Sequence, residues 1–260
     1  MFFAFIQNES EIVLWGFDRL VTAMNSFMRK ASVQLFISFL VLFYFCKPAL
    51  SEQSIGTEPQ SLGPRVLCQA KQILSSLKST HYSHKSNVNE SSGLYIFDCS
   101  ALVYYILGRA APGSIASVPV DPNHRHAQAK NFYDTFSNAP TMNAKDGWQR
   151  IIRLMDAEPG DLIAWRKDPV AQKGNTGHIV IVLEKPAEEK DGAIRITAFD
   201  SSRTGHAQDT RRKGTSGVGS GVMSFRVDEA GAPIALHWSS PEKKQITVPI
   251  AIGRAMAVSP

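Results

Sequence analysis

The sequence predicts an α+β fold in which N-terminal helices pack on an antiparallel sheet of about six strands. Apolar residues recur at helical spacing between residues 65 and 155. From residue 161 onward they alternate or run continuously, separated by Pro, Gly and Asp. Helices therefore come first and strands second, an order typical of α+β proteins rather than of alternating βαβ units.

We expect four helices, over residues 65–79, 99–107, 125–136 and 148–155, and a polar loop over 81–93. In the helix over 99–107, Leu102, Val103, Ile106 and Leu107 form the apolar face, and the glycine at 108 ends it. The expected strands cover residues 161–165, 178–183, 193–199, 222–227, 234–238 and 248–255. The glycine-rich stretch 217–221 has no helix after it, so we expect a tight turn into the strand at 222 and no dinucleotide loop.

The N-terminal segment has the pattern of a secretory signal peptide. A basic start at Met28, Arg29 and Lys30 precedes an apolar run over 31–45, and Ala49 and Ser51 supply small residues for cleavage near Ser51. Residues 1–51 are thus an N-terminal extension plus signal peptide, with Met28 as an alternative start. The other interpretation is an uncleaved anchor. Residues 52–64 are expected to be a linker and 65–260 a single domain that is periplasmic or secreted.

Composition excludes several classes of protein. The 260 residues carry a net charge of +5, from 28 Lys and Arg against 23 Asp and Glu, without long basic runs, so a nucleic-acid partner is not indicated. His124 and His126 have a spacing found in some metal sites, but no acidic or thiol partner follows at ligand spacing. We expect no metal and no cofactor, no membrane span in the mature form, and a monomer.

Cys99 is the predicted nucleophile. It lies where an extended aromatic segment meets a helix, and the positive end of a helix dipole raises the thiolate fraction of a thiol in the first turn. Cys68 lies among apolar residues and is expected to be a buried small side chain. A Cys68–Cys99 disulfide is the competing prediction, since the compartment is oxidising.

His178 and Asp200 complete a predicted triad. His178 opens a nearly continuous apolar strand, from which it can act as a base toward a thiol. Asp200 ends the next strand, so pairing of the two strands brings its carboxylate to the imidazole. His206 and Asp209 are the fallback candidates for the third position.

At these residues the chain resembles the NlpC-type, papain-like cysteine peptidases that cleave bacterial cell-wall peptides. Residues 98–103 (Asp-Cys-Ser-Ala-Leu-Val), 159–165 (Pro-Gly-Asp-Leu-Ile-Ala-Trp) and 177–181 (Gly-His-Ile-Val-Ile) are similar to the family's motifs in order, and Asp200 takes the place of its third polar residue. The resemblance implies a papain-like fold, with Cys99 as nucleophile, His178 as general base and Asp200 as the orienting group.

The resemblance also implies how substrate is held. Tyr95, Asp98 and Ser100 would hold the free amine of the peptide, and the Cys99 backbone N–H would meet the oxyanion. Ala101 departs from the family's usual glycine. Compared with compact members of the family, the chain is longer in 112–145 and 184–192, and we expect these insertions to be lids or substrate-selecting loops. We expect a secreted cysteine hydrolase that cleaves an amide bond of peptidoglycan stem peptides through a thioester. An inactive binding domain on the same fold and a thiol acyl or amide transferase are the alternatives.

Overall fold

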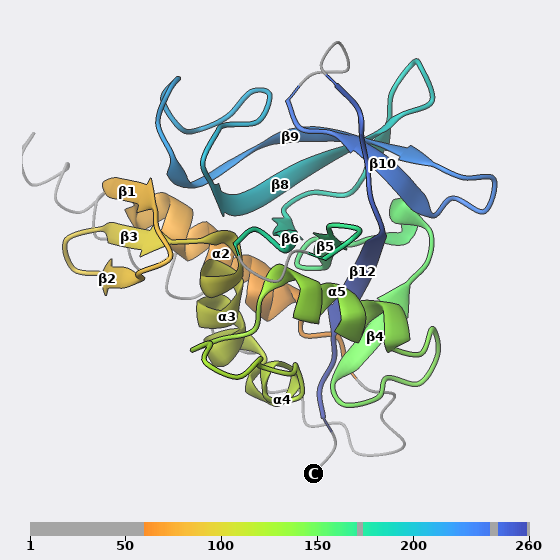
Figure 1. Ribbon diagram of the computed structural model, residues 1–260, viewed down its shortest axis with the longest axis horizontal. Coiled ribbons are helices and arrows are strands. Elements are labelled where there is room, and N and C mark those ends of the chain that lie inside the picture. The colour runs from red at the N-terminus through yellow and green to blue at the C-terminus, as the bar shows by residue number, and fades with distance from the viewer. Residues whose placement is uncertain (1–59, 171–173, 240–243, 259–260) are drawn as a thin grey trace, which may run out of the picture. The chain divides into compact units, whose positions relative to one another are not determined.

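The computed structural model describes residues 60–170, 174–239 and 244–258, and their fold is α+β (Figure 1). The predicted signal peptide, the alternative start at Met28 and most of the predicted linker lie outside these residues. The end of that linker belongs to the folded domain, because Gly63 begins a helix and Ser61 forms a bridge with Met256. No helix among the described residues is long and apolar enough to span a bilayer.

Within the part of the chain that the structure describes, four α-helices precede most of the strands: α2 (Gly63–Ser76), α3 (Cys99–Ala110), α4 (Pro112–Ala116) and α5 (Ala129–Asn138). Three of the predicted helices are thereby confirmed with shifted ends. The predicted helix over 148–155 is wrong. Its residues form strand β4 (Trp148–Ile151), which pairs with strand β12, and a 3-10 turn (Leu154–Asp156). The apolar pattern of these residues is too short to distinguish the period of a helix from that of a strand.

Nine strands of the described residues form one large antiparallel sheet, in the order β11-β10-β9-β8-β6-β5-β12-β4, with β7 paired to β8. Each of the six predicted strands has a counterpart, and β4 and the two-residue strands β7 and β11 are additional. The bounds are β5 (Leu162–Arg166), β6 (Gly177–Val182), β7 (Ala187–Glu188), β8 (Ile194–Ser202), β9 (Gly217–Val227), β10 (Pro233–His237), β11 (Ile246–Thr247) and β12 (Ile250–Ala255).

A small mixed sheet lies beside α2 and α3 (Figure 1). Strand β3 (Leu94–Phe97) pairs in parallel with β1 (Ser79–Tyr82) and in antiparallel with β2 (Asn87–Asn89). The predicted loop over 81–93 is therefore partly wrong, because pairing with β3 makes strands of polar residues. The Ser201 hydroxyl donates to the Phe97 carbonyl at 2.7 Å, which fixes the end of β3 beside the end of β8.

The large sheet is buried on both faces. Along β6, Ile179 and Ile181 pack toward the helices, whereas Val180 and Val182 pack into a second apolar cluster on the opposite face. The sheet curls so that β10 contacts β12 around this second cluster. Burial on both faces explains why the strand is continuously apolar in sequence. Packing on both faces also fixes the position of β6, whose second residue is His178.

Candidate active site

Cys99 is the first residue of α3 and carries a free thiol. The Cys68–Cys99 disulfide is therefore wrong. Asp98 caps the helix: its Oδ1 accepts the Ala101 N–H at 2.8 Å and the Ser100 hydroxyl at 3.0 Å. The N–H groups of Cys99 and Ser100, at the head of the helix, have no acceptor within the helix itself. The thiol thus lies at the positive end of a well-capped helix.

His178 lies opposite this thiol because of the glycine before it. Gly177 has φ of +149°, and an added Cβ would lie 1.9 Å from the Trp165 carbonyl oxygen, so the close approach of β6 to β5 at this point requires glycine. The His178 ring hydrogen-bonds the Cys99 thiol. Its Nε2 lies 2.6 Å from Asp200 Oδ2, which leaves Nδ1 as the nitrogen that faces the sulfur.

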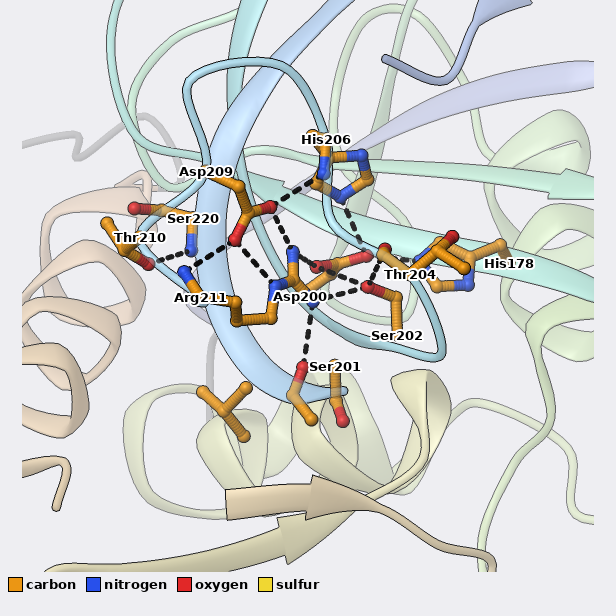
Figure 2. A network of polar contacts seen from close by, with 12 residues as sticks. His178, Asp200, Ser201, Ser202, Thr204, His206, Asp209, Thr210, Arg211 and Ser220 are labelled. Atoms are coloured by element: carbon orange, nitrogen blue, oxygen red, sulfur yellow. Dashed lines mark hydrogen bonds and ion pairs between the residues drawn. The ribbon is translucent and has the colours of Figure 1, made fainter. Parts of the chain in front are cut away.

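Asp200 is completely buried and is contacted by two histidine rings and one arginine. Its Oδ2 contacts His178 and His206 Nε2, the latter at 3.1 Å, and its Oδ1 accepts from an Arg211 N–H at 2.9 Å (Figure 2). Burial alone would raise the pKa of Asp200, but the His206 and His178 rings hold that pKa well below its usual range. Asp200 is thus ionised and fixed in orientation.

His206 and Asp209, the alternative candidates for the third catalytic position, lie in the same network, and only His206 contacts Asp200 directly. His206 joins Asp200 to the Trp238 carbonyl, 3.1 Å from its Nδ1, so both ring nitrogens face oxygen acceptors. Asp209 accepts from Arg211 Nε at 2.8 Å and from the His206 backbone N–H at 2.7 Å (Figure 2). Of the predicted alternatives, Asp200 is the carboxylate that contacts His178, and Asp209 lies one step further away.

The predicted turn over 217–221 is wrong, and its glycines make room for this network. They belong to β9, where Gly217, Gly219 and Gly221 share one face. An added Cβ on Gly219 would lie 2.7 Å from Arg211 Cγ, and one on Gly221 would lie 2.8 Å from His206 Cβ. Glycine at every second position leaves one face of the strand without side chains. The loop that carries His206 and Arg211 can therefore pack directly on the backbone of β9.

His178 is positively charged at neutral pH. Burial by itself would lower its pKa, but the negative charges of Cys99 and Asp200, with their hydrogen bonds, raise the pKa of His178 to about 10. Trp165 and Trp238 flank the ring, with centroids 5.2 and 5.0 Å from that of the imidazole. A thiol at a helix N-terminus with a histidine as its proton carrier is the pairing that nucleophilic catalysis by sulfur requires. The arrangement is that of an activated sulfur nucleophile.

The thiol opens into a cavity of about 680 Å³. Asp98 and Ser100 line it, as the sequence predicts. Tyr95 lies elsewhere: its side chain is buried in the core, and its hydroxyl is 2.8 Å from Ser76 Oγ. Tyr82 lines the cavity instead. Burial and the negative charges of Cys99 and Asp98 raise the pKa of Tyr82, which indicates how close its hydroxyl is to the nucleophile.

Tyr82 and Arg211 were missed by sequence reasoning. The parallel pairing of β1 with β3 aligns Tyr82 with Phe97 and so brings it beside Cys99, but these four-residue strands have no distinctive pattern in sequence. Arg211 lies in a run of three basic residues that looks like solvated surface. The feature of the sequence that could have indicated its burial is the glycine at every second position of 217–221, because Arg211 packs against Gly219.

Neither His124 nor His126 belongs to a group of three or more potential metal ligands within the described residues.

Comparison of the chain with protein-family models, with curated proteins and with solved structures found no match.

Proposed function

We propose that the protein is a cysteine hydrolase that cleaves an amide bond in cell-wall peptides. One observation carries the proposal: Cys99, His178 and Asp200 are linked by hydrogen bonds in that order, at the end of a cavity large enough for a peptide. A nucleophile, a proton carrier and an ionised orienting group are what acyl transfer through sulfur requires. The site motifs resemble those of the NlpC-type peptidases, and a papain-like fold is part of the proposal.

In the proposed reaction, the Cys99 thiolate attacks the amide carbonyl carbon and forms a C–S bond. The C–N bond then breaks, and the His178 imidazolium gives its proton to the leaving amine. Water next attacks the thioester while His178 takes a proton from it, and the thiolate leaves with the C–S electrons. The backbone N–H groups of Cys99 and Ser100 are the proposed donors to the oxyanion.

Substrate contacts follow from the cavity. Asp98 and Ser100 border the thiol, and Tyr82 takes the place that the sequence assigned to Tyr95. We propose that this group holds the free amine of the peptide, since a carboxylate and two hydroxyls can accept hydrogen bonds from an ammonium. The pattern of residues 28–51 supports a periplasmic or secreted protein.

The experiment that tests this function uses the purified protein and a panel of muropeptides, with products identified by mass spectrometry. Wild type is expected to release peptide fragments, whereas Cys99→Ala and His178→Ala are not. His81→Ala is the matched control, because this exposed histidine is not part of the cavity wall. Absence of cleavage by wild type across several peptide types would contradict the proposal. Retention of muropeptide binding by all variants without cleavage would favour the inactive binding domain.

A further inference from the structure

The network behind the proposed triad contains a second histidine, which the proposed reaction does not use. The His206 side chain is completely buried, on the loop between β8 and β9 (Figure 2). Its Nε2 lies 3.1 Å from Asp200 Oδ2, the same oxygen that His178 Nε2 contacts at 2.6 Å. Its Nδ1 lies 3.1 Å from the Trp238 carbonyl oxygen. Both ring nitrogens therefore have a partner, and both partners are oxygens.

These two partners decide how many protons the His206 ring carries. A carbonyl oxygen accepts a hydrogen bond and cannot donate one, so the contact with Trp238 needs a proton on Nδ1. Asp200 is ionised, and an ionised carboxylate is likewise only an acceptor, so the contact with Asp200 needs a proton on Nε2. A neutral imidazole carries a proton on one nitrogen only. It would turn a bare nitrogen toward an oxygen in a buried place, which costs free energy.

The acidic groups around His206 also favour a positive ring. Asp209, on the same loop, accepts the His206 backbone N–H at 2.7 Å. Burial raises the pKa of Asp209, but hydrogen bonds from Arg211 and from the His206 backbone hold that pKa below its usual value. Two carboxylates thus lie against His206, Asp200 from β8 and Asp209 from its own loop. Arg211 binds both carboxylates, and its nearest contact on Asp200 is the other oxygen, Oδ1.

Two neighbouring strands face the ring with uncharged groups. Strand β9 presents Gly221, whose added Cβ would lie 2.8 Å from His206 Cβ. After β10 comes Trp238, whose ring centroid lies 4.4 Å from that of His206. His237 precedes Trp238, and since side chains alternate along a strand, it points away from the face on which His206 lies. The titratable groups that surround the ring are therefore those of the network: Asp200, Asp209, Arg211 and His178.

We propose that His206 is a doubly protonated positioning residue, which holds Asp200 toward His178 and shares its negative charge. The part of His206 in catalysis rests on the proposed function, whereas its protonation does not. Hydrogen bonds between charged groups are roughly twice as strong as neutral ones, so His206 and Arg211 together fix both oxygens of Asp200. Because Asp200 also faces the positive His206 ring, it holds the proton of His178 less tightly. His178 is thus a stronger acid toward the leaving amine.

NMR spectroscopy of the imidazole nitrogens tests the proposal directly. At pH 7 we expect two protonated ring nitrogens on His206, whereas a neutral ring has one. His206→Gln and His206→Asn both remove the charge, but the Gln amide can still reach Asp200 and the Asn amide the Trp238 carbonyl. In both variants the midpoint of the His178 titration should rise by about 0.5 to 1 pH unit, since a cation is removed nearby. At pH 10, protonated His178 should increase from about half to about three quarters or more.

His81→Gln is the matched control, because it makes the same change at an exposed histidine outside the network and should leave the midpoint unchanged. Urea unfolding and alkylation of Cys99 by iodoacetamide show whether each variant is folded with an accessible thiol. A bare ring nitrogen on His206 at pH 7 would overturn the proposal. A midpoint that stays or falls in a folded variant would do so too, since loss of packing alone loosens Asp200 and lowers the midpoint.

These measurements need no peptide, so they decide the protonation of His206 whether or not muropeptides are cleaved, and the wild-type spectrum decides it even if neither variant folds. Where wild type cleaves muropeptides, both variants should lower kcat by about three- to ten-fold with KM little changed. Unchanged kcat would refute the positioning role of His206 and leave the hydrolase standing. Inert muropeptides with a doubly protonated His206 would refute only the hydrolase.

Discussion

At the scale of single residues, His178 lies between Cys99 and Asp200, and its interactions with both raise its pKa. This explains why its pKa rises to about 10 although burial opposes the charged ring. A group whose pKa is raised on folding stabilises the folded state fully below its unfolded value of about 6.5. That stabilisation is then lost as the pH rises through about 10.

The first prediction is that His178 keeps its proton at pH 8, where an ordinary histidine has lost it. NMR titration of the imidazole resonances should give a midpoint near 10 for this ring. In Cys99→Ala the midpoint should fall, because one of these two interactions is removed while that with Asp200 remains. A midpoint near 6.5 in wild type would contradict the ion pair.

We assign Arg211 a positioning role, because it binds Asp200 and so fixes the carboxylate that contacts His178. Its side chain is 2% exposed and its guanidinium binds both Asp200 and Asp209. Arg211→Met keeps much of the volume but removes the guanidinium from both carboxylates, and should cost about 3–5 kcal/mol of unfolding free energy. Urea unfolding checks this value. Arg211→Lys should recover part of the loss, and equal effects of the two variants would argue that only packing matters.

At the scale of elements, β9 provides the floor for the loop that carries His206 and Arg211. Glycine at 217, 219 and 221 leaves that face of the strand open. Strands β8 and β9 pair over nine successive positions, from Ile194 with Phe225 to Ser202 with Gly217. Asp200 therefore projects from a strand whose neighbour is shaped to accept the network around it.

Gly221→Ala is the prediction at this scale. The new Cβ would lie 2.9 Å from the Ala207 carbonyl oxygen and from Asp209 Oδ2, so the loop must shift. We expect a loss of about 1–3 kcal/mol in stability and lower muropeptide cleavage. Gly108→Ala in α3 is the control, because nothing lies within 4 Å of its added Cβ and helix propensity favours alanine by about 1 kcal/mol. Thermal unfolding and cleavage rates distinguish the two. Equal stability would contradict the role of the β9 face.

At the scale of the whole molecule, residues distant in sequence meet because helices and the small sheet pack on one face of the large sheet. On that face Phe136 of α5 packs against Trp148, with ring centroids 4.7 Å apart, and lies over Gly253 of β12. These contacts lie near the edge of the sheet formed by β12 and β4, whereas the network of Asp200 lies at β8 and β9.

Phe136→Ala should therefore separate stability from chemistry. Loss of this buried ring is expected to cost about 3–5 kcal/mol of unfolding free energy. The His178 titration and the iodoacetamide rate should stay unchanged at temperatures where the variant is folded. Urea unfolding followed by tryptophan fluorescence, together with alkylation rates, makes the comparison. A changed alkylation rate in the folded variant would show that α5 also positions the site.

The sequence predicted what depends on local pattern. The helix start at Cys99, the apolar strand behind His178 and the carboxylate at the end of the paired strand all follow from periodicity and from residue type, and the contact between His178 and Asp200 is present as expected. The α+β class followed from the order of elements. The number of strands was underestimated because β7 and β11 have only two residues each and because the residues of β4 were assigned to a helix.

Features that depend on non-local pairing could not be predicted in the same way. Tyr82 reaches the cavity through the pairing of β1 with β3, and Tyr95 is carried into the core by the same sheet. Arg211 becomes buried because a loop folds onto glycines that looked like a turn. In each case the decisive contact joins segments whose sequences give no signal of each other.

The most direct test of the central claim is detection of a covalent intermediate. Muropeptide is mixed with the protein, quenched rapidly with acid and analysed by intact-protein mass spectrometry. We predict a mass increase equal to the acyl fragment, located on Cys99 and removed by hydroxylamine as thioesters are. The adduct should be absent in Cys99→Ala and should turn over slowly in His178→Ala if it forms there. Release of peptide products by wild type without any adduct in Cys99, or equal cleavage by Cys99→Ala, would contradict the account.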